Sequence, residues 1–251
     1  MYVRLKHALS TLALEAVRSP KRGAPRTAVA WLVAFCDLCR GERFVLPHGA
    51  IATRLRRRRP GLRGGGRTEV QLGTAWHRIV RLGLLNEENG AASLPEPFRP
   101  HFPYMNRQGH RAAAVLRALE TSSRGQRLRG KAAAVWRGVA LFNGGLFFEC
   151  HEYLEDLWRA APPEERSFYQ GIILIAAGFY HYEKGNLHGA RTKLAAGIEK
   201  LKPYLPASHG VRLDRWMASL APWLARIDAG ATGVLDTSEI PKIALAFKRA
   251  S

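Results

Sequence analysis

The sequence is poor in cysteine, in acidic residues and in long apolar runs. Its three Cys, an odd number in 251 residues, exclude a disulfide scaffold and fit a reducing, cytoplasmic environment. No apolar run approaches the roughly 20 residues that cross a bilayer, so we expect no membrane partner. The basic and apolar start of the chain is interrupted by Glu15, and we do not interpret it as a signal peptide. An apolar fraction of 47% also excludes general disorder, because it is enough to build one or two domain cores.

The positive charge is concentrated in the first half of the chain. Residues 1–130 hold 24 Lys and Arg against 8 Asp and Glu, whereas residues 131–251 hold 15 against 12. The formal net charge of the whole chain is +19. This asymmetry predicts a polyanion-binding module joined to a nearly neutral domain.

Hydrophobic spacing in the first half predicts helices followed by a small β-hairpin. We expect helices over residues 27–40, 48–55 and 68–82, with residues 45–47 as a short extended link. The segment from Arg56 to Arg67 is broken by proline and three glycines, so we expect it to be irregular. Asn89-Gly90 accepts the positive φ angles of a tight turn and therefore predicts the hairpin. The apolar face expected for the third helix comprises Val70, Leu72, Ala75, Trp76, Ile79, Val80 and Leu82.

This order of elements, over about residues 5–95, resembles a winged helix-turn-helix domain. Residues 51–55 match the first helix of the pair, residues 75–85 match the end of the recognition helix, and residues 86–94 match the wing. Residues 56–67 depart from the pattern, because they make the turn between the two helices long and very basic.

The resemblance implies that the helix from Thr68 lies in a DNA major groove, with residues near its start facing base edges. Arginines of the preceding segment would bind phosphates through their planar guanidinium groups. The alternative is a winged helix used for protein contact, with the arginines in a solvated loop, and Glu69 favours it because it would repel phosphate. The candidate nucleic-acid-binding residues are Arg54, Arg56, Arg57, Arg58, Arg59, Arg63, Arg67, Thr68, Gln71 and Thr74.

Four prolines between residues 95 and 104 indicate a domain boundary, since proline prevents helix continuation and stiffens the chain. We expect a basic winged-helix-like domain over 1–96, a Pro-rich linker with a basic helix up to about Glu120 over 97–130, and a helical bundle over 131–251. The predicted fold class is therefore mainly all-α, with a small hairpin in the first domain.

The second half has the spacing of a compact helical bundle. The helix before Asn143 is expected to break at residues 143–145, and further helices are expected over 146–159, 165–184, 187–201 and 211–229. One pair of these helices follows nearly the spacing of a tetratricopeptide repeat, but a single unit favours a bundle over a solenoid. The final segment is expected to be extended and to pack through Ile240 and Ile243.

A set of motifs in this half resembles a known family. The motifs are Phe142-Asn143, Phe147-Phe148-Glu149, His151-Glu152, Leu154-Glu155, Trp158, Phe168-Tyr169-Gln170-Gly171, Ala176-Ala177, Tyr180-His181, Gly185-Asn186 and Gly189-Ala190. Together they resemble the family called domain of unknown function 309, over about residues 130–205. The resemblance implies a small all-helical bundle and no established activity.

Polar residues of these helices form a candidate cluster. If two of the helices form a hairpin, their facing surfaces bring together Glu149, His151, Glu152, Glu155, Gln170 and His181. The cluster is a buried hydrogen-bond network, a pocket for an anionic or small molecule, or a metal site. We expect no metal or other cofactor, because the two Glu-x-x-His motifs of di-metal bundles are absent and Cys36-x-x-Cys39 has no partner pair.

These patterns lead to one main hypothesis and two alternatives. The main hypothesis is a cytoplasmic DNA-binding protein, similar to a transcription regulator, whose helical bundle senses a ligand or mediates assembly, for example as a homodimer. The first alternative is a module that binds protein or RNA without sequence-specific DNA binding. The second is a metal-binding or enzymatic bundle centred on His151, although no nucleophile, base and acid occur at a recognisable catalytic spacing.

Overall fold

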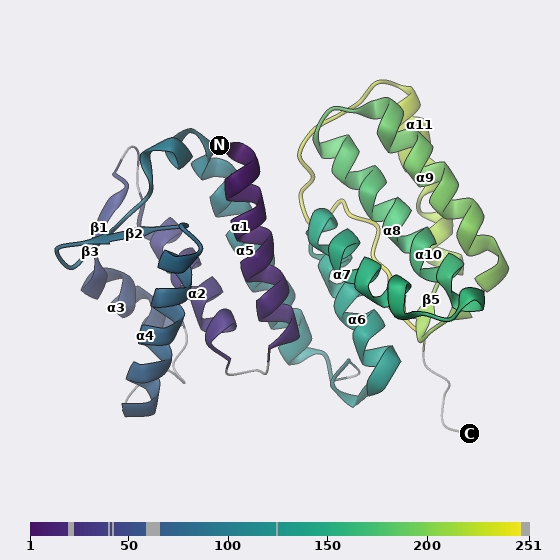
Figure 1. Ribbon diagram of the computed structural model, residues 1–251. Coiled ribbons are helices and arrows are strands. Elements are labelled where there is room, and N and C mark those ends of the chain that lie inside the picture. Colours follow the sequence, from purple (N-terminus) through teal and green to yellow (C-terminus); the bar gives the residue numbers. More distant parts are fainter. Residues whose placement is uncertain (20–22, 40, 42, 59–65, 124, 247–251) are drawn as a thin grey trace. The chain divides into compact units, whose positions relative to one another are not determined.

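A computed structural model describes residues 1–19, 23–39, 41, 43–58, 66–123 and 125–246. The chain forms two compact units, residues 1–116 and 117–251, and helix α5 (Phe102–Thr121) runs through the division between them (Figure 1). Both units are mostly helical, with short antiparallel strands, which confirms the predicted fold class. In the part of the chain that the structure describes, no helix combines the length and the apolar character needed to span a membrane.

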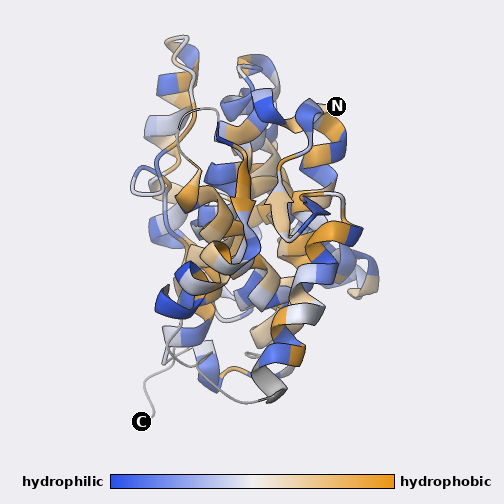
Figure 2. Ribbon diagram, turned by 90° about the vertical axis from the view of Figure 1, so that its left-hand side faces the viewer, coloured by the Kyte–Doolittle hydropathy of each residue, from blue (hydrophilic) through white to orange (hydrophobic). Residues whose placement is uncertain are grey.

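The N-terminal unit follows the order helix, helix, strand, helix, helix, hairpin, helix. Its elements are α1 (Tyr2–Arg18), α2 (Ala24–Leu38), β1 (Val45–Pro47), α3 (His48–Arg58), α4 (Gly66–Arg81), β2 (Asn86–Glu88), β3 (Ala91–Ser93), η2 (Glu96–His101) and the first part of α5. Figure 2 shows hydrophobic and hydrophilic stretches alternating along the helices, as expected for helices with one buried face.

The three strands of this unit form an antiparallel sheet in the order β1-β3-β2. The turn between β2 and β3 has positive φ at Asn89 (51°) and Gly90 (73°), so the predicted hairpin is confirmed at these two residues. Strand β3 pairs with both neighbours, with Ala92 opposite Leu46 and Glu87. Leu46 and Ala92 are buried and attach the sheet to the helices.

The core of the N-terminal unit lies between α2 and α4. Trp31 of α2 and Trp76 of α4 have ring centres 5.6 Å apart, and the His48 ring lies 4.7 Å from the first and 4.6 Å from the second. The apolar face predicted for α4 is confirmed by the burial of Leu72, Ala75, Trp76 and Ile79. It is wrong for Val70, which is 71% exposed.

Three of the element boundaries that differ from the predictions in this unit have a clear physical reason or a larger shift than one or two residues. Helix α2 begins at Ala24 rather than at residue 27, because the first turn of a helix accepts a proline (here Pro25). Helix α3 continues through Arg58, so the first arginines of the segment predicted to be irregular are helical, which suits a residue with high helix propensity. Helix α5 begins at Phe102, earlier than expected, directly after the 3-10 turn η2.

The C-terminal unit is a helical bundle that a short β-structure completes. Its elements are η3 (Gly125–Arg127), α6 (Gly130–Asn143), α7 (Phe147–Ala160), α8 (Pro163–Glu183), α9 (Leu187–Leu201), η4 (Lys202–Tyr204), β4 (Ala207–Ser208), β5 (Val211–Arg212), α10 (Asp214–Ala218), α11 (Ala221–Asp228) and β6 (Ala244–Leu245). The predicted break after Asn143 is confirmed, with Gly145 at a φ of 75°. The α9 boundaries agree with the prediction, and the Asn186 side chain caps that helix by accepting the Gly189 N–H at 2.8 Å.

Helices α8 and α9 pack at close range through glycines. A Cβ placed on Gly197 would lie 2.7 Å from the carbonyl oxygen of Gly171 and 2.6 Å from the Ile175 side chain. A Cβ on Gly178 would lie 2.7 Å from Leu194 and 3.1 Å from the Ala190 carbonyl oxygen. The two backbones therefore approach as closely as they do because these positions lack side chains.

The single helix predicted over 211–229 is wrong. Residues 211–212 pair with β4 and β6, and the helical part is divided into α10 and α11, with Pro222 in the first turn of α11. The apolar face expected for that stretch is buried at Leu213, Trp216, Leu220, Trp223 and Ile227, whereas Met217 and Leu224 are half-buried.

The extended final segment predicted from the sequence is confirmed. Ile240 and Ile243 are buried, and β6 adds to the edge of β5. The Asn143 side chain holds Ile243 through two backbone hydrogen bonds, each of 2.9 Å. Asn143 therefore ties the last helix turn of α6 to the end of the unit.

Candidate functional site

Helix α4 presents one face to solvent and buries the opposite one. The outer face of α4 consists of the exposed residues Glu69, Val70, Thr74, His77 and Arg81. The Thr74 hydroxyl donates to the Val70 carbonyl oxygen at 2.9 Å, one helical turn earlier. Between them, a Cβ on Gly73 would meet no atom within 4 Å. The outer face of α4 is therefore a ridge that a nucleic acid groove could approach closely.

Gln71, expected to face bases, is placed differently. Its Nε2 donates to the Thr27 hydroxyl at 3.0 Å, and the side chain is half-buried between α4 and α2. This contact stabilises the packing of α4. A contact between residues 44 apart in sequence leaves no local signal, so the spacing of α4 alone could not reveal it.

Arg54 differs from the other arginines of α3 in having a nearly buried carboxylate as its partner. Its Nε lies 3.5 Å from Oδ2 of Asp37, which is 9% exposed, and His110 Nε2 lies 3.2 Å from Oδ1 of the same carboxylate. Its contribution to phosphate binding would require leaving this carboxylate, so we assign Arg54 a structural contact.

The remaining arginines near α4 lie on α3 and on the segment that follows it. Arg57 is exposed, and Arg56 Nη2 lies 3.8 Å from Glu69 Oε1 with both side chains exposed. An exposed ion pair of this kind contributes less than about 1 kcal/mol, so a phosphate can replace the carboxylate. Arg58, Arg67 and Thr68 lie in α3 and α4, but their side chains are outside the described part, and Arg59 and Arg63 lie outside the described residues altogether.

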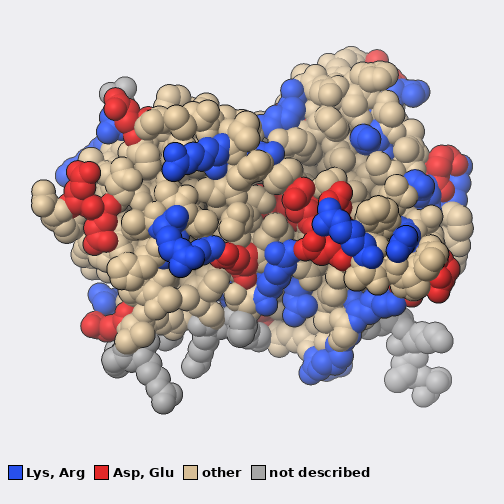
Figure 3. All heavy atoms as spheres, in the orientation of Figure 1, with Lys and Arg blue, Asp and Glu red and all other residues tan. Residues whose placement is uncertain are grey.

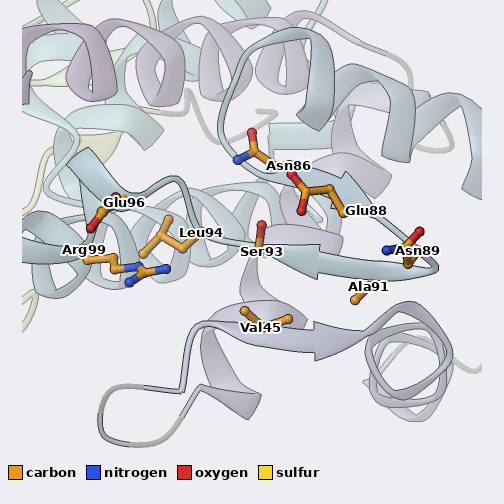
Figure 4. Close-up of a pocket in the computed structure, with 9 residues that line it drawn as sticks. All are labelled: Val45, Asn86, Glu88, Asn89, Ala91, Ser93, Leu94, Glu96 and Arg99. Carbon is orange, nitrogen blue, oxygen red and sulfur yellow. The ribbon is translucent and has the colours of Figure 1, made fainter.

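The hairpin beside α4 is acidic. Residues 86–94 contain no Lys or Arg, and Glu87 accepts the Trp76 indole N–H at 2.5 Å. The outward side of the sheet borders a groove of about 450 Å³, which Glu88 flanks at the hairpin, with Glu96 and Arg99 beyond the end of β3 (Figure 4). A polyanion would therefore meet its positive charge at α3 and α4 and not at the hairpin.

Charged side chains are mixed over the face of the molecule that Figure 3 shows. Lys and Arg occur on both units there, with Asp and Glu between them. The sequence asymmetry in charge therefore does not appear as one continuous basic patch on this face.

The cluster predicted in the second half is brought together only in part. His151 Nδ1 lies 3.2 Å from Glu152 Oε1, and its Nε2 lies 3.7 Å from Glu155 Oε1. Glu155 also accepts a hydrogen bond of 2.6 Å from Arg159. These side chains are half-exposed or exposed, so they form a charged strip along α7 instead of a sealed network.

The other members of the predicted cluster lie apart from this strip. Glu149 is buried at the start of α7. On α8, His181 Nδ1 lies 3.2 Å from the Asn186 side-chain amide, and burial lowers the His181 pKa, with a smaller effect from Lys193. Gln170 lies eleven residues earlier on α8, about 16 Å along the helix axis. One small ligand could not contact both ends of this set.

Among the residues that the structure describes, no group of three or more His, Cys, Asp or Glu side chains is arranged to hold a metal ion. The cysteines are also unsuited to this role. Burial raises the pKa of the Cys39 thiol to about 12 and raises the Cys36 and Cys150 values as well, so the three thiols stay protonated near neutral pH.

A polar cluster that the sequence analysis missed joins α6, α8 and the β4–β5 turn. Lys131 Nζ donates to both Glu165 oxygens at 2.8 Å, and His209 Nε2 lies 3.3 Å from Glu165 Oε2. The His209 ring stacks on Phe168 with centres 4.0 Å apart, and its Nδ1 lies 2.8 Å from the Ser208 hydroxyl. Positive φ at His209 (49°) and Gly210 (81°) makes this a hairpin turn, and the pair His-Gly between short apolar runs was the available signal.

This cluster predicts an acid-dependent part of the stability of the C-terminal unit. The Lys131 hydrogen bond, followed by contacts with His209, lowers the pKa of Glu165 below its ordinary value of 4.5. The folded state therefore binds fewer protons than the unfolded state, and the stabilisation is present above about pH 5 and lost as the pH falls through the lowered pKa. In urea unfolding at about pH 7 and about pH 3, Glu165→Gln should lose less stability on acidification than the wild type.

Glu164→Gln is the matched control, because it removes an exposed carboxylate from the same helical turn. It should keep the wild-type dependence on pH. Equal pH dependence in Glu165→Gln and the wild type would contradict the role given to this cluster.

Comparison with known proteins places a family resemblance within this unit. Residues 135–192 match the family described as "Domain of unknown function (DUF309)". A relative, "Uncharacterized protein YpuF" of Bacillus subtilis (strain 168), is 36% identical over 69 residues, which make up 27% of this chain and 40% of the relative. The chain therefore spans well under half the length of that curated relative. The comparison with solved structures gave no match.

The matched residues run from α6 to the first turns of α9 and contain His151, Glu155 and the α7–α8 hairpin. The family resemblance predicted from the motifs of the second half is thus confirmed: the segment over residues 135–192 is similar to the domain of unknown function DUF309.

Proposed function

We propose that the N-terminal unit binds duplex DNA with the outer face of α4 in the major groove, and that the C-terminal bundle senses a ligand or mediates assembly. The observation that carries the proposal is the exposed face of α4, the third helix of a helix–strand–helix–helix–hairpin arrangement, directly beside exposed arginines. This order, with β3 between β1 and β2, supports the resemblance to a winged helix-turn-helix domain. A recognition helix in such a domain needs one free face and a buried one.

Charge supports the same proposal. Arg56 and Arg57 extend from α3 beside the start of α4. Four further arginines follow in the sequence up to Arg67. Guanidinium groups would position the unit on phosphates, while the outer face of α4 would contact bases. A cytoplasmic location belongs to the proposal, since the three cysteines are free, as expected in a reducing compartment.

Salt-dependent binding tests the proposal. The full chain should bind a random duplex with an affinity that falls steeply with salt, by a log–log slope of about 0.9 per phosphate contact. Arg56→Ala combined with Arg57→Ala should weaken binding about tenfold or more at moderate salt and reduce that slope by about 2. Fluorescence anisotropy of a labelled duplex across a salt series measures both quantities.

The matched control removes two exposed arginines from the C-terminal unit, as Arg191→Ala with Arg212→Ala. This variant loses the same charge, so its affinity should stay within about twofold of the wild type. Unchanged affinity in the α3 variant, or an equal loss in both variants, would refute the role of the α3 arginines in DNA binding.

The acidic hairpin favours a second candidate function, an interaction module for RNA or protein. Glu87 and Glu88 stand where a wing would approach a phosphate backbone. Competition with single-stranded and structured RNA separates the two candidates, because tighter binding of RNA than of duplex DNA would favour the second.

A further inference from the structure

The outer face of α4 is apolar at its centre. Val70, at 71% exposure, is the most exposed large hydrophobic side chain of the described residues. It was expected to join the core, yet Leu72, Ala75 and Trp76 provide the buried face without it. Most of the Val70 side chain is therefore available for contact with a partner.

Thr74 extends the same surface by one helical turn. Its hydroxyl donates to the Val70 carbonyl oxygen, which restricts its rotamer, and both residues lie four apart on the exposed side of the helix. Gly73, between them, has open space around its Cα, so a base edge can approach both methyl-bearing side chains.

Two side chains in the middle of α4 that could read bases through paired hydrogen bonds are engaged elsewhere in this unit. Gln71, which could pair with adenine, donates to Thr27. Arg78, which could pair with guanine, binds both oxygens of Glu15 on α1. Within the stretch 69–80, the outer face of α4 therefore offers a carboxylate, methyl groups and one imidazole.

The apolar group that a major groove displays is the C5-methyl of thymine. We propose that Val70 and Thr74 contact thymine methyl groups, so that α4 selects A·T pairs in the major groove. This inference rests on the proposed function and names the bases that it recognises. Residues four apart rise about 6 Å along a helix, against about 3.4 Å per base step, so the two thymines should lie one or two steps apart.

Thymine-to-uracil replacement tests the inference, because it removes the methyl group and leaves the hydrogen-bonding edges unchanged. Duplexes that the full wild-type chain prefers are first selected from a random library, and each thymine is then replaced in turn. Uracil at one or two neighbouring positions should weaken binding about fourfold each, as expected for one buried methyl group. Val70→Ala and Thr74→Ser should bind thymine and uracil duplexes alike at those positions.

Val45→Ala is the matched control, because it shortens a valine that is 51% exposed on β1 and should keep the full sensitivity to uracil. Duplex binding with no sensitivity to uracil would overturn the thymine contact and leave the proposed function standing. Uracil sensitivity that persists in both α4 variants would overturn the assignment to Val70 and Thr74. Absence of duplex binding by the wild type would overturn both proposals together.

Discussion

Replacing Gly197 with alanine is expected to destabilise the C-terminal unit severely. The new Cβ would lie 2.7 Å from the Gly171 carbonyl oxygen and 3.0 Å from the Ile175 backbone nitrogen. Backbone atoms cannot rotate away as a side chain can, so α8 and α9 must move apart along their contact. Overpacking of this kind should cost about 3 kcal/mol, or about 10 °C in Tm for a unit of this size, measured by urea and thermal unfolding.

Two other glycine variants serve as controls. In Gly171→Ala the closest atoms belong to the Leu201 side chain, at 2.5 and 2.8 Å, which can adjust, so a smaller loss is expected. Gly73→Ala on α4 meets no atom within 4 Å and should stabilise its helix by up to about 1 kcal/mol. Wild-type stability of Gly197→Ala would mean that α8 and α9 do not cross at this distance.

The second large effect is expected at Phe142, the centre of the aromatic core of the C-terminal unit. Its side chain is fully buried, and its ring centre lies 5.3 to 5.6 Å from those of Phe147, Phe179 and Trp216. These rings come from α7, α8 and α10, so Phe142 of α6 joins four helices. Phe142→Ala should cost about 4 kcal/mol, because it removes these contacts and leaves a cavity.

Phe148→Ala provides the comparison for this variant. Phe148 is half-exposed and its ring meets that of Tyr180 at 5.8 Å, so its loss should cost about 1 kcal/mol. Chemical unfolding followed by tryptophan fluorescence measures both variants. Equal losses at the two positions would contradict the central place of Phe142.

Local signals predicted much of the fold. The ends of α9 follow from Gly185-Asn186 before it and Pro203 after it, and the first hairpin follows from Asn89-Gly90, because these residues act on their immediate neighbours. The break between α6 and α7 follows in the same way from two adjacent glycines. Such residues determine backbone geometry whatever packs around them.

The wrong predictions arose where contacts between residues distant in sequence override the local pattern. The stretch 211–229 has good helical spacing, yet the pairing of Val211 with β4 and β6 removes its first residues from the helix. Val70 fits the apolar pattern of α4, but the register set by Trp31 and Trp76 turns it outward. The spacing of apolar residues indicates which of them share a helix face. It does not show how much of that face the neighbouring helix covers.

In the candidate sites, too, contacts within one helix could be predicted from the sequence and contacts between helices could not. The contact between His151 and Glu155 follows from their four-residue spacing, because one helix provides both residues. The contacts of Gln71 with Thr27 and of Arg54 with Asp37 depend on how separate helices pack. The spacing of residues within one helix therefore could not predict them. The same holds for the contact of His209 with Glu165.

The hydrogen bonds between Asn143 and Ile243 can form only late in the synthesis of the chain. The two residues are 100 positions apart, so the ribosome must produce the whole bundle before this clamp can close. The N-terminal unit gathers its own contacts within residues 1–116 and can mature while the rest is still being translated. Until then, the Asn143 side chain lacks these two partners, and the surface that later buries Ile240 and Ile243 is exposed to water.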